Sequence, residues 1–509
     1  MFYDRMSPLT RQLAGISAGP LLALLVLLCP CPEGLQAVGQ RALAGTVWIT
    51  AWWMLDIFSL AGTALLSIIV YALLGVASPL ELFQSFGSGM IMLMIGATLL
   101  IGAWTESRFI QRYAYWCMNL PIVKNRPFRF ILVFGLACGL ASVIVPNIPL
   151  AILFTAIAVA TADGLGIKPG ESNLIRILCM VGGMAACYGG IGSPLGGAPN
   201  LITIGYVQKF AGYEVEFWQW TFIGLPAAVL CLLSMFVLAR ILFPLKAQEK
   251  ESLPVPKAYI EGKLREMGPI SRYEAIAVAM MLIALFLWIL GPSIAGWAGV
   301  KSLKPVLSVT GVAYFAGVLL FVVPRCIDKS SGKLVFAMTW PQAEKNIGWS
   351  IMIMLLGGLV IGDALLRGGM DKWLAGVFQA VLGDISGVWV WFLAVLATAL
   401  LSQVANNLAM MALFTPVVIQ LGYAYGFNPV AAALSVGMAA NVGVMFPFSS
   451  TPIAASIVGA CGHASIRDYA LFGFFICVIG ATIVFGCAYL LGPIAFPDVP
   501  LAPPAVTIK

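Results

Sequence analysis

Residues 189–200 read GGIGSPLGGAPN, and this stretch interrupts an apolar run that extends over 174–207. Glycine and proline disfavour a continuous helix, so the run is expected to break in its middle. A second apolar run, 430–461, is interrupted in the same way by FPFSSTP at 446–452. At such breaks the freed carbonyl groups can coordinate a cation, and the N-terminal ends of half-helices can attract an anion. Both interruptions are therefore candidate parts of a binding site.

The composition places these breaks inside a membrane. Of the 509 residues 61% are hydrophobic and only 10% are charged, with a mean hydropathy of +0.99. A soluble chain would carry about 25% charged residues. The composition thus predicts a polytopic membrane protein and excludes a soluble metabolic enzyme, a secreted disulfide scaffold and a disordered regulator.

The apolar runs predict an all-α fold with about eleven transmembrane helices, since a crossing needs about 20 apolar residues. The predicted crossings are 13–30, 36–54, 57–75, 88–105, 174–207, 218–243, 273–291, 306–324, 348–366, 430–461 and 469–492. Two further stretches, 127–162 and 386–421, are too long for one crossing and are interrupted by VPNIP at 145–149 and QVANN at 403–407. We expect each to form a re-entrant hairpin whose polar tip is enclosed by protein or water.

The distribution of basic residues predicts the orientation. With a cytoplasmic N-terminus, 21 Lys and Arg residues fall on the cytoplasmic side and 7 on the outside. This asymmetry follows the positive-inside rule and predicts a multi-pass protein of the cell (inner) membrane with its C-terminus outside. It also explains the net charge of +7 without a nucleic-acid partner. The polar stretch 245–272 is expected to be a cytoplasmic linker between the halves 1–244 and 273–509.

The two halves share short motifs in the same order. Ser142-x4-Asn147 recurs as Ser402-x4-Asn407, and LFT at 153–155 recurs at 413–415, both with an offset of 260 residues. Because an odd number of crossings separates the copies, the pattern predicts an inverted repeat of the kind found in secondary transporters. In that architecture the binding site lies near the membrane midplane, where interrupted helices from both halves meet.

The motifs also carry a family resemblance, which extends from about residue 45 to 490. GSPLGGAPNLI at 192–202, and Ser450-Thr451-Pro452 followed by Gly462 and IRD at 466–468, are similar to the paired loops of the divalent anion:sodium symporter family, within the ion-transporter superfamily. The resemblance implies a homodimer whose transport domains move as elevators against a scaffold. In that family each hairpin tip carries Ser-Asn-Thr, in which Asn and Thr contact a substrate carboxylate while nearby serines and loop carbonyls hold sodium.

Carried over position by position, the resemblance gives two sets of candidate residues. The candidates for the substrate are Asn147, Ile148, Ser193, Pro199, Asn200, Asn407, Leu408, Ser450 and Thr451. The candidates for sodium are Ser142, Asn147, Gly192, Ser402, Asn407 and Ser449. No cofactor other than Na⁺ as a coupling ion is expected.

Both tips depart from the family pattern. Ile148 and Leu408 stand where the family has threonine, and Pro146 and Asn406 stand where it has serine. The sequence therefore predicts a secondary transporter of a small anion, expected to be a di- or tricarboxylate or sulfate-like dianion. It leaves open the anion, the coupling ion, and whether the transporter works by symport or by anion exchange (antiport).

Other functions remain as alternatives. Within the superfamily, the chain could be an arsenite or sodium/proton carrier; outside it, an intramembrane enzyme or a passive channel. Acidic residues inside a membrane would mark a proton relay. Asp56 and Asp363 are the best candidates for one, although an interfacial or capping role is favoured for both. No acid–base or metal constellation and no Walker motif occurs, so an enzyme or an ATP-driven pump is not expected.

Overall fold

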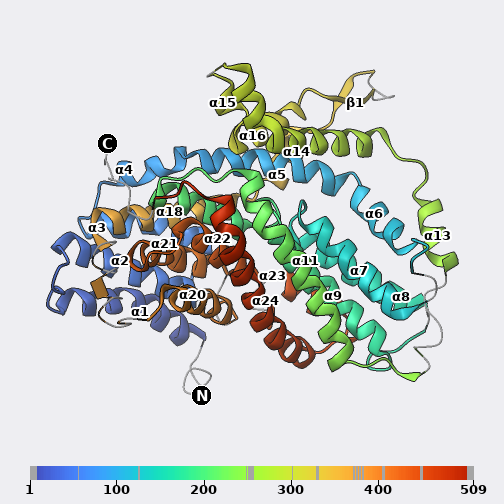
Figure 1. Ribbon diagram of the computed structural model, residues 1–509, viewed down its shortest axis with the longest axis horizontal. Coiled ribbons are helices and arrows are strands. Elements are labelled where there is room, and N and C mark those ends of the chain that lie inside the picture. Colours follow the sequence, from blue (N-terminus) through green and yellow to red (C-terminus); the bar gives the residue numbers. More distant parts are fainter. Residues whose placement is uncertain are drawn as a thin grey trace.

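The computed structural model describes most of the chain between residues 8 and 500 (Figure 1). Outside the described residues lie 1–7, 56, 124–125, 165, 248, 250–256, 301, 328–331, 371–372, 374–375, 378–379, 381–382, 384, 404–406, 447–450 and 501–509. For some others, among them Ala198, Leu408 and Thr451, only the backbone is described.

The described elements are almost all helices. In the first half they are α1 (Pro8–Leu28), α2 (Ala37–Leu55), α3 (Leu60–Leu73), α4 (Pro79–Phe83), the 3-10 turn η2 (Gln84–Gly87), α5 (Gly89–Glu106), α6 (Phe109–Met118), α7 (Pro127–Ser142), α8 (Asn147–Gly164), α9 (Asn173–Gly190), α10 (Ala198–Tyr206), the π-helical turn η3 (Val207–Ala211) and α11 (Phe217–Leu242). The linker and second half contain α13 (Lys257–Glu266), α14 (Arg272–Ala298), α15 (Leu303–Val306), α16 (Val309–Leu319), β1 (Pro324–Ile327), β2 (Leu334–Phe336), α17 (Trp340–Asn346), α18 (Trp349–Arg367), α20 (Gly387–Leu401), α21 (Asn407–Tyr425), α22 (Pro429–Asn441), α23 (Thr451–Gly459) and α24 (Ile466–Ala495).

Local sequence signals fix many of these boundaries. α14 and α24 each begin with a capping box, formed by Ser271 with Glu274 and by Ser465 with Asp468. Proline occupies the first turn of α7, where its missing N–H costs no intrahelical hydrogen bond. Six helices of the described part are long and apolar enough to cross a membrane: α5, α8, α9, α11, α14 and α24. Several other apolar helices are shorter, including α3, α7, α16, α20 and α22.

The helix pairings recur between the two halves of the chain. α7 and α8 pack on α9, and α20 and α21 pack on α22. Likewise α5 packs on α16, while α18 packs on α3. In Figure 1 the hairpin α7–α8 lies beside α9 and α11, and α14–α16 lie along one edge. The opposite orientation of the two halves in the membrane stays a prediction.

Small residues allow the closest helix pairs. A Cβ added to Gly96 of α5 would lie 2.3 Å from the backbone of Ala313 in α16, and one added to Gly317 would lie 2.5 Å from the carbonyl of Gly96. In the other pair, a Cβ on Gly357 of α18 would lie 2.5 Å from the Ala64 side chain of α3. Such small-residue contacts let backbones approach in a membrane, where burial of apolar surface drives no association.

The all-α prediction is wrong at one place. β1 and β2 pair as an antiparallel hairpin, with Pro324 opposite Phe336 and Ile327 opposite Leu334. The strands shorten the predicted crossing 306–324 to the 11-residue helix α16, because Pro324 begins β1. The linker 245–272 also contains a helix, α13, in which Lys263 and Glu266 pair at 2.8 Å.

Candidate functional site

The tip of the first hairpin is formed where α7 ends at Ser142 and α8 begins at Asn147. Ser142 is fully buried, and its hydroxyl donates to the carbonyl of Ala186 in α9 at 2.6 Å and to Val145 at 3.3 Å. Two helices joined by a short turn thus form the stretch 127–162, and its re-entrant course through the membrane stays a prediction. A hydroxyl at its end reaches the neighbouring broken helix.

The side-chain amide of Asn147 lies among oxygen atoms of three segments. In the orientation that satisfies its hydrogen bonds, Nδ2 donates to Gly196 O at 2.6 Å, Ser142 Oγ at 2.9 Å and Ala186 O at 3.0 Å. Glycine is required beside it, because a Cβ added at Gly190 would lie 2.2 Å from the amide. Ile148, the next residue, is 38% exposed and has no such role in this cluster.

The loop between α9 and α10 holds the predicted residues Ser193 and Asn200. The hydroxyl of Ser193 donates to the carbonyl of Val143 in the hairpin turn and accepts from Leu195 N–H at 3.1 Å. Nδ2 of Asn200 donates to Gly190 O and to Ser193 O, both at 2.7 Å. The buried Asn200 thus closes the break by bonding the last carbonyl of α9 and a carbonyl of the loop.

Three further contacts define this loop. Trp220 of α11 donates its indole N–H to Ile191 O at 2.9 Å, which anchors the loop on that helix. The predicted Gly192 donates its N–H to Gly189 O at 2.9 Å, and a Cβ on it would lie 3.0 Å from Val143. Pro199 is buried at the start of α10 and its carbonyl accepts from Thr203 at 2.9 Å. Gly196, rather than Gly192, supplies the carbonyl that contacts Asn147.

Asn441, at the end of α22, links the second half of the chain to this loop and was missed in the sequence. Its Nδ2 donates to Asn200 Oδ1 at 2.9 Å, and it is 3% exposed. A Cβ on Gly197 would lie 3.3 Å from Asn441 Oδ1 and 3.6 Å from the Asn147 amide. Asn441 has no counterpart in the motif repeat, but a single amide in an apolar run is itself a signal of a polar site.

The second tip has different contacts. Ser402 is fully buried and donates to Ala399 O of its own helix at 2.8 Å. Oδ1 of Asn407, at the start of α21, is buried and has no hydrogen-bond partner among the described residues. Gln403, which is not among the predicted site residues, accepts from Met445 N–H at 2.8 Å through Oε1 and so joins the tip to the second break.

Part of the predicted second site cannot be placed. Asn406, Ser449 and Ser450 lie outside the described residues. For Leu408 and Thr451, only their positions in α21 and at the start of α23 are described. The structure therefore brings together the first-half candidates around Asn147, and places Ser402 and Asn407 at the second tip.

Each hairpin also contacts the broken helix of the other half. Thr155 of α8 pairs with Ser456 of α23 at 3.0 Å, and Ser456 pairs in turn with Tyr469 of α24 at 2.6 Å. In the other half, Thr203 of α10 contacts Met411 of α21 at 3.5 Å. These buried contacts tie both candidate regions into one helical body.

The two acidic candidates for a proton relay take no part in the contacts described above. Asp363, a candidate for a proton relay, pairs with Arg367 at 2.8 Å and with Lys209 at 3.6 Å, which supports the interfacial role. Asp56 lies outside the described residues. Within the described part, no three His, Cys, Asp or Glu residues gather in a way that could hold a metal ion.

The architecture and the Asn-centred breaks can now be compared with known proteins. The family described as sodium:sulfate symporter transmembrane region matches residues 11–495. The chain belongs to this family. It is accordingly a multi-pass membrane transporter and not an enzyme, and the resemblance found in its motifs is confirmed.

Individual relatives resemble the chain in sequence, and one solved structure resembles it in fold. The sodium-dependent dicarboxylate transporter SdcS of Staphylococcus saprophyticus is 27% identical over 95% of this chain and 92% of its own length. SdcS of Staphylococcus aureus strain USA300 is 28% identical with the same shares covered. The crystal structure of the YdaH transporter of Alcanivorax borkumensis has a similar fold, with a TM-score of 0.54 at 14% identity over 82% of this chain and 89% of that one.

Proposed function

We propose that this chain couples the movement of sodium to that of a small divalent anion, a di- or tricarboxylate or a sulfate-like ion. Membership of the sodium:sulfate symporter family and the similarity to SdcS support both the cation and the class of anion. Symport is proposed over anion exchange because the polar groups at the first tip are suited to a cation.

The observation that carries this proposal is the oxygen-rich cage around Asn147. A half-turn of the amide about its last side-chain bond would place Oδ1 where Nδ2 now lies, within 3.0 Å of Ala186 O, Gly196 O and Ser142 Oγ. The amide oxygen would then lie beside three other oxygens, an arrangement that a hard cation bound among them stabilises and another hydrogen-bond acceptor does not. We propose that Asn147 donates to the loop in the absence of sodium and ligates sodium through Oδ1 when the ion binds.

The anion would be held by dipoles and amides rather than by a fixed cation. α8 begins at Asn147 and α10 begins at Ala198, so two helix N-termini start at this cage. Helix N-termini favour anions through free N–H groups and the helix dipole. Moving a dianion against about 100 mV costs about 4.6 kcal/mol, so at least two sodium ions are needed to cancel the electrical cost.

Alternating access is proposed to follow the two groups of helices. α3 with α18, and α5 with α16, form close pairs that carry none of the predicted site residues. The hairpins and broken helices form a second group: α7 and α9 pack on α11, α20 and α22 pack on α24, and α10 and α21 face the first group through contacts with α18. We propose that this second group moves as an elevator against the first in a homodimer, with the N-terminus cytoplasmic and the C-terminus outside.

Flux into proteoliposomes tests the proposal. An inward sodium gradient is expected to drive uptake of labelled succinate, citrate or sulfate, and replacing Na⁺ by K⁺ should abolish it. Ser142→Ala is expected to raise the sodium concentration at half-maximal flux about fivefold to tenfold, because about 1 kcal/mol of ligand interaction is lost. Ser234→Ala is the matched control, since that hydroxyl donates only to Cys231 O of its own helix at 2.8 Å.

Three results would contradict the proposal. Uptake that needs a preloaded anion but no sodium would assign anion exchange. Quenching of a pH dye on sodium addition, without anion flux, would assign a sodium/proton carrier. No flux of any of the three anions, under a sodium gradient or against a counter-anion, would refute an anion carrier.

A further inference from the structure

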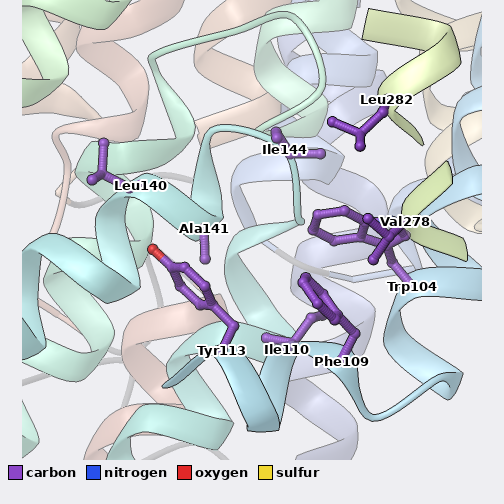
Figure 2. A pocket seen from close by; sticks show the side chains of 9 residues that line it. All are labelled: Trp104, Phe109, Ile110, Tyr113, Leu140, Ala141, Ile144, Val278 and Leu282. Carbon is purple, nitrogen blue, oxygen red and sulfur yellow. The ribbon is translucent and has the colours of Figure 1, made fainter. Parts of the chain in front are cut away.

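An apolar cavity of about 260 Å³ lies between the first hairpin and a group of helices that carries no predicted site residue. Leu140, Ala141 and Ile144 of the hairpin form one wall, and residues of α5, α6 and α14 form the other (Figure 2). Figure 2 shows the methyl group of Ala141 directed toward the ring of Tyr113. The cavity therefore separates two groups of helices and is not enclosed within either.

The hairpin wall of the cavity is the reverse side of the candidate ion site. Ala141 lines the cavity, while its neighbour Ser142 donates to Ala186 O in the cage around Asn147. Ile144 lies in the turn between Ser142 and Asn147 and also lines the cavity. Any occupant of the cavity would thus touch the turn that positions both cage residues.

The chemistry of the lining excludes a polar ligand. Seven of its nine lining side chains are hydrocarbon, and the indole N–H of Trp104 donates to Ala277 O at 2.7 Å. Water in a cavity needs two to four polar partners, and cavities lined by aliphatic and aromatic groups instead accept apolar molecules. The transported anion would lose its hydration here without compensation.

The position of the cavity identifies the apolar molecule. Two of its lining residues are largely exposed at the protein surface, Leu140 at 45% and Leu282 at 58%. Leu282 continues on α14 into Ile283, Phe286 and Ile289, each at least half exposed. In a membrane protein this surface faces hydrocarbon, so the cavity opens beside lipid chains.

We propose that the cavity holds one acyl chain of a membrane lipid, and that this chain controls the movement of the first hairpin against α5, α6 and α14. The control of movement rests on the proposed transport function, whereas the occupancy does not. An acyl chain in the cavity would contact both the hairpin and the helices α5, α6 and α14 without belonging to either. Its entry and exit would therefore change the energy needed to move the hairpin past these helices.

Photolabelling of the full-length protein in nanodiscs tests the occupancy. The probe is phosphatidylcholine with a diazirine in its acyl chain, and adducts are located by mass spectrometry. We expect adducts on Leu140, Ala141 or Ile144. Val278→Trp, which fills the cavity from α14, should abolish these adducts. Ile289→Trp, an equally large change on the exposed face of the same helix, should leave them unchanged.

Each result decides one part of the proposal. Adducts on the α14 surface but none on the hairpin turn would refute a lipid in the cavity. Hairpin adducts that persist at the wild-type level in Val278→Trp would show that the probe reaches the turn from outside the cavity, and would refute it as well. This labelling requires no transport, so it remains decisive even if the chain moves none of the tested anions.

Flux measurements test the control of movement separately. Val278→Trp is expected to lower the maximal rate with little change in KM, whereas Ile289→Trp should leave both unchanged. A second experiment uses the wild-type protein, so it does not depend on the folding of the Val278 variant. In membranes of diphytanoyl lipid, whose branched chains enter the cavity less easily, the wild-type protein should show the same loss of maximal rate. Unchanged maximal rates in both experiments would refute control by the lipid.

Discussion

The two hairpin tips share the order Ser-x4-Asn, but their polar groups have different partners. At the first tip, Ser142 and Asn147 bond to carbonyls of α9 and of the loop that follows it. At the second, Ser402 bonds within its own helix and the carbonyl oxygen of Asn407 is buried without a partner among the described residues. A repeated motif therefore does not impose a repeated hydrogen-bond network.

The difference suggests different roles for the two tips. A buried acceptor without a partner lowers the stability of the fold by about 1–3 kcal/mol. A ligand that bonds to it would recover this free energy, so we expect ligand binding to stabilise the second tip more than the first. The first tip is held in place before any ligand binds, by side chains and carbonyls of the hairpin, α9 and the loop. We therefore expect changes at the first tip to reduce folding stability and transport together, and changes at the second to act on ligand affinity.

Gly196→Ala should have the largest effect. Its Cβ would lie 2.3 Å from Gly190 O and 2.7 Å from Ser142 O, both backbone atoms that cannot rotate away. We expect loss of transport and a free energy of unfolding lower by about 3 kcal/mol or more. A glycine beside the second tip, changed in Gly443→Ala, meets the side-chain oxygen of Ser402 at 2.4 Å, which can rotate, so a smaller loss is expected. Thermal unfolding followed by tryptophan fluorescence compares the two, and equal losses would contradict a more rigid first tip.

The paired variants Asn147→Ala and Asn407→Ala test the comparison directly. Removing the first amide leaves Gly196 O without this donor and Ala186 O with the Ser142 hydroxyl alone, so unfolding should become easier by about 1–3 kcal/mol and transport should stop. Removing the second deletes an acceptor that has no partner among the described residues, so stability should not fall while the KM for the anion rises. The measurements are thermal unfolding and labelled uptake, with Asn173→Ala, whose Nδ2 bonds Pro244 O at 2.8 Å at the surface, as the control. A greater loss of stability in Asn407→Ala would reverse the assignment.

Much of the first tip could be predicted from the sequence, because proline and glycine break an apolar helix wherever they cluster. The bounds of the hairpins and the break at 189–200 follow from this rule. Asn441 and Gln403 could not be assigned, since the motif repeat offers no counterpart and their partners lie in other segments. The strand pair β1–β2 was missed because two strands of four and three residues carry little periodic signal.

Asn441→Ala tests how far the second half supports the first. Asn441 donates to Asn200 Oδ1 at 2.9 Å, and Asn200 in turn holds Gly190 O and Ser193 O. Losing that one bond should lower the free energy of unfolding by about 1 kcal/mol. It should also raise the sodium concentration at half-maximal uptake several-fold, because the loop carbonyls near Asn147 are held less firmly. Asn428→Ala, which removes a helix cap in the same half, is the control for a general loss of stability. Uptake measured over a range of sodium concentrations distinguishes the two variants. The same sodium concentration at half-maximal uptake in both would show that Asn441 acts only on folding.

Ile148→Thr should have the smallest effect and the most specific one. Ile148 is 38% exposed at the start of α8, at the position where the family resemblance implies a threonine that contacts a carboxylate. If the tip binds the anion, a new hydroxyl should add about 1 kcal/mol and lower the KM for succinate about fivefold. Ile148→Val is the matched control, because valine has the branched shape of threonine without its hydroxyl. Equal KM values for the two variants would indicate that Ile148 does not face the substrate, and that the first tip binds sodium alone.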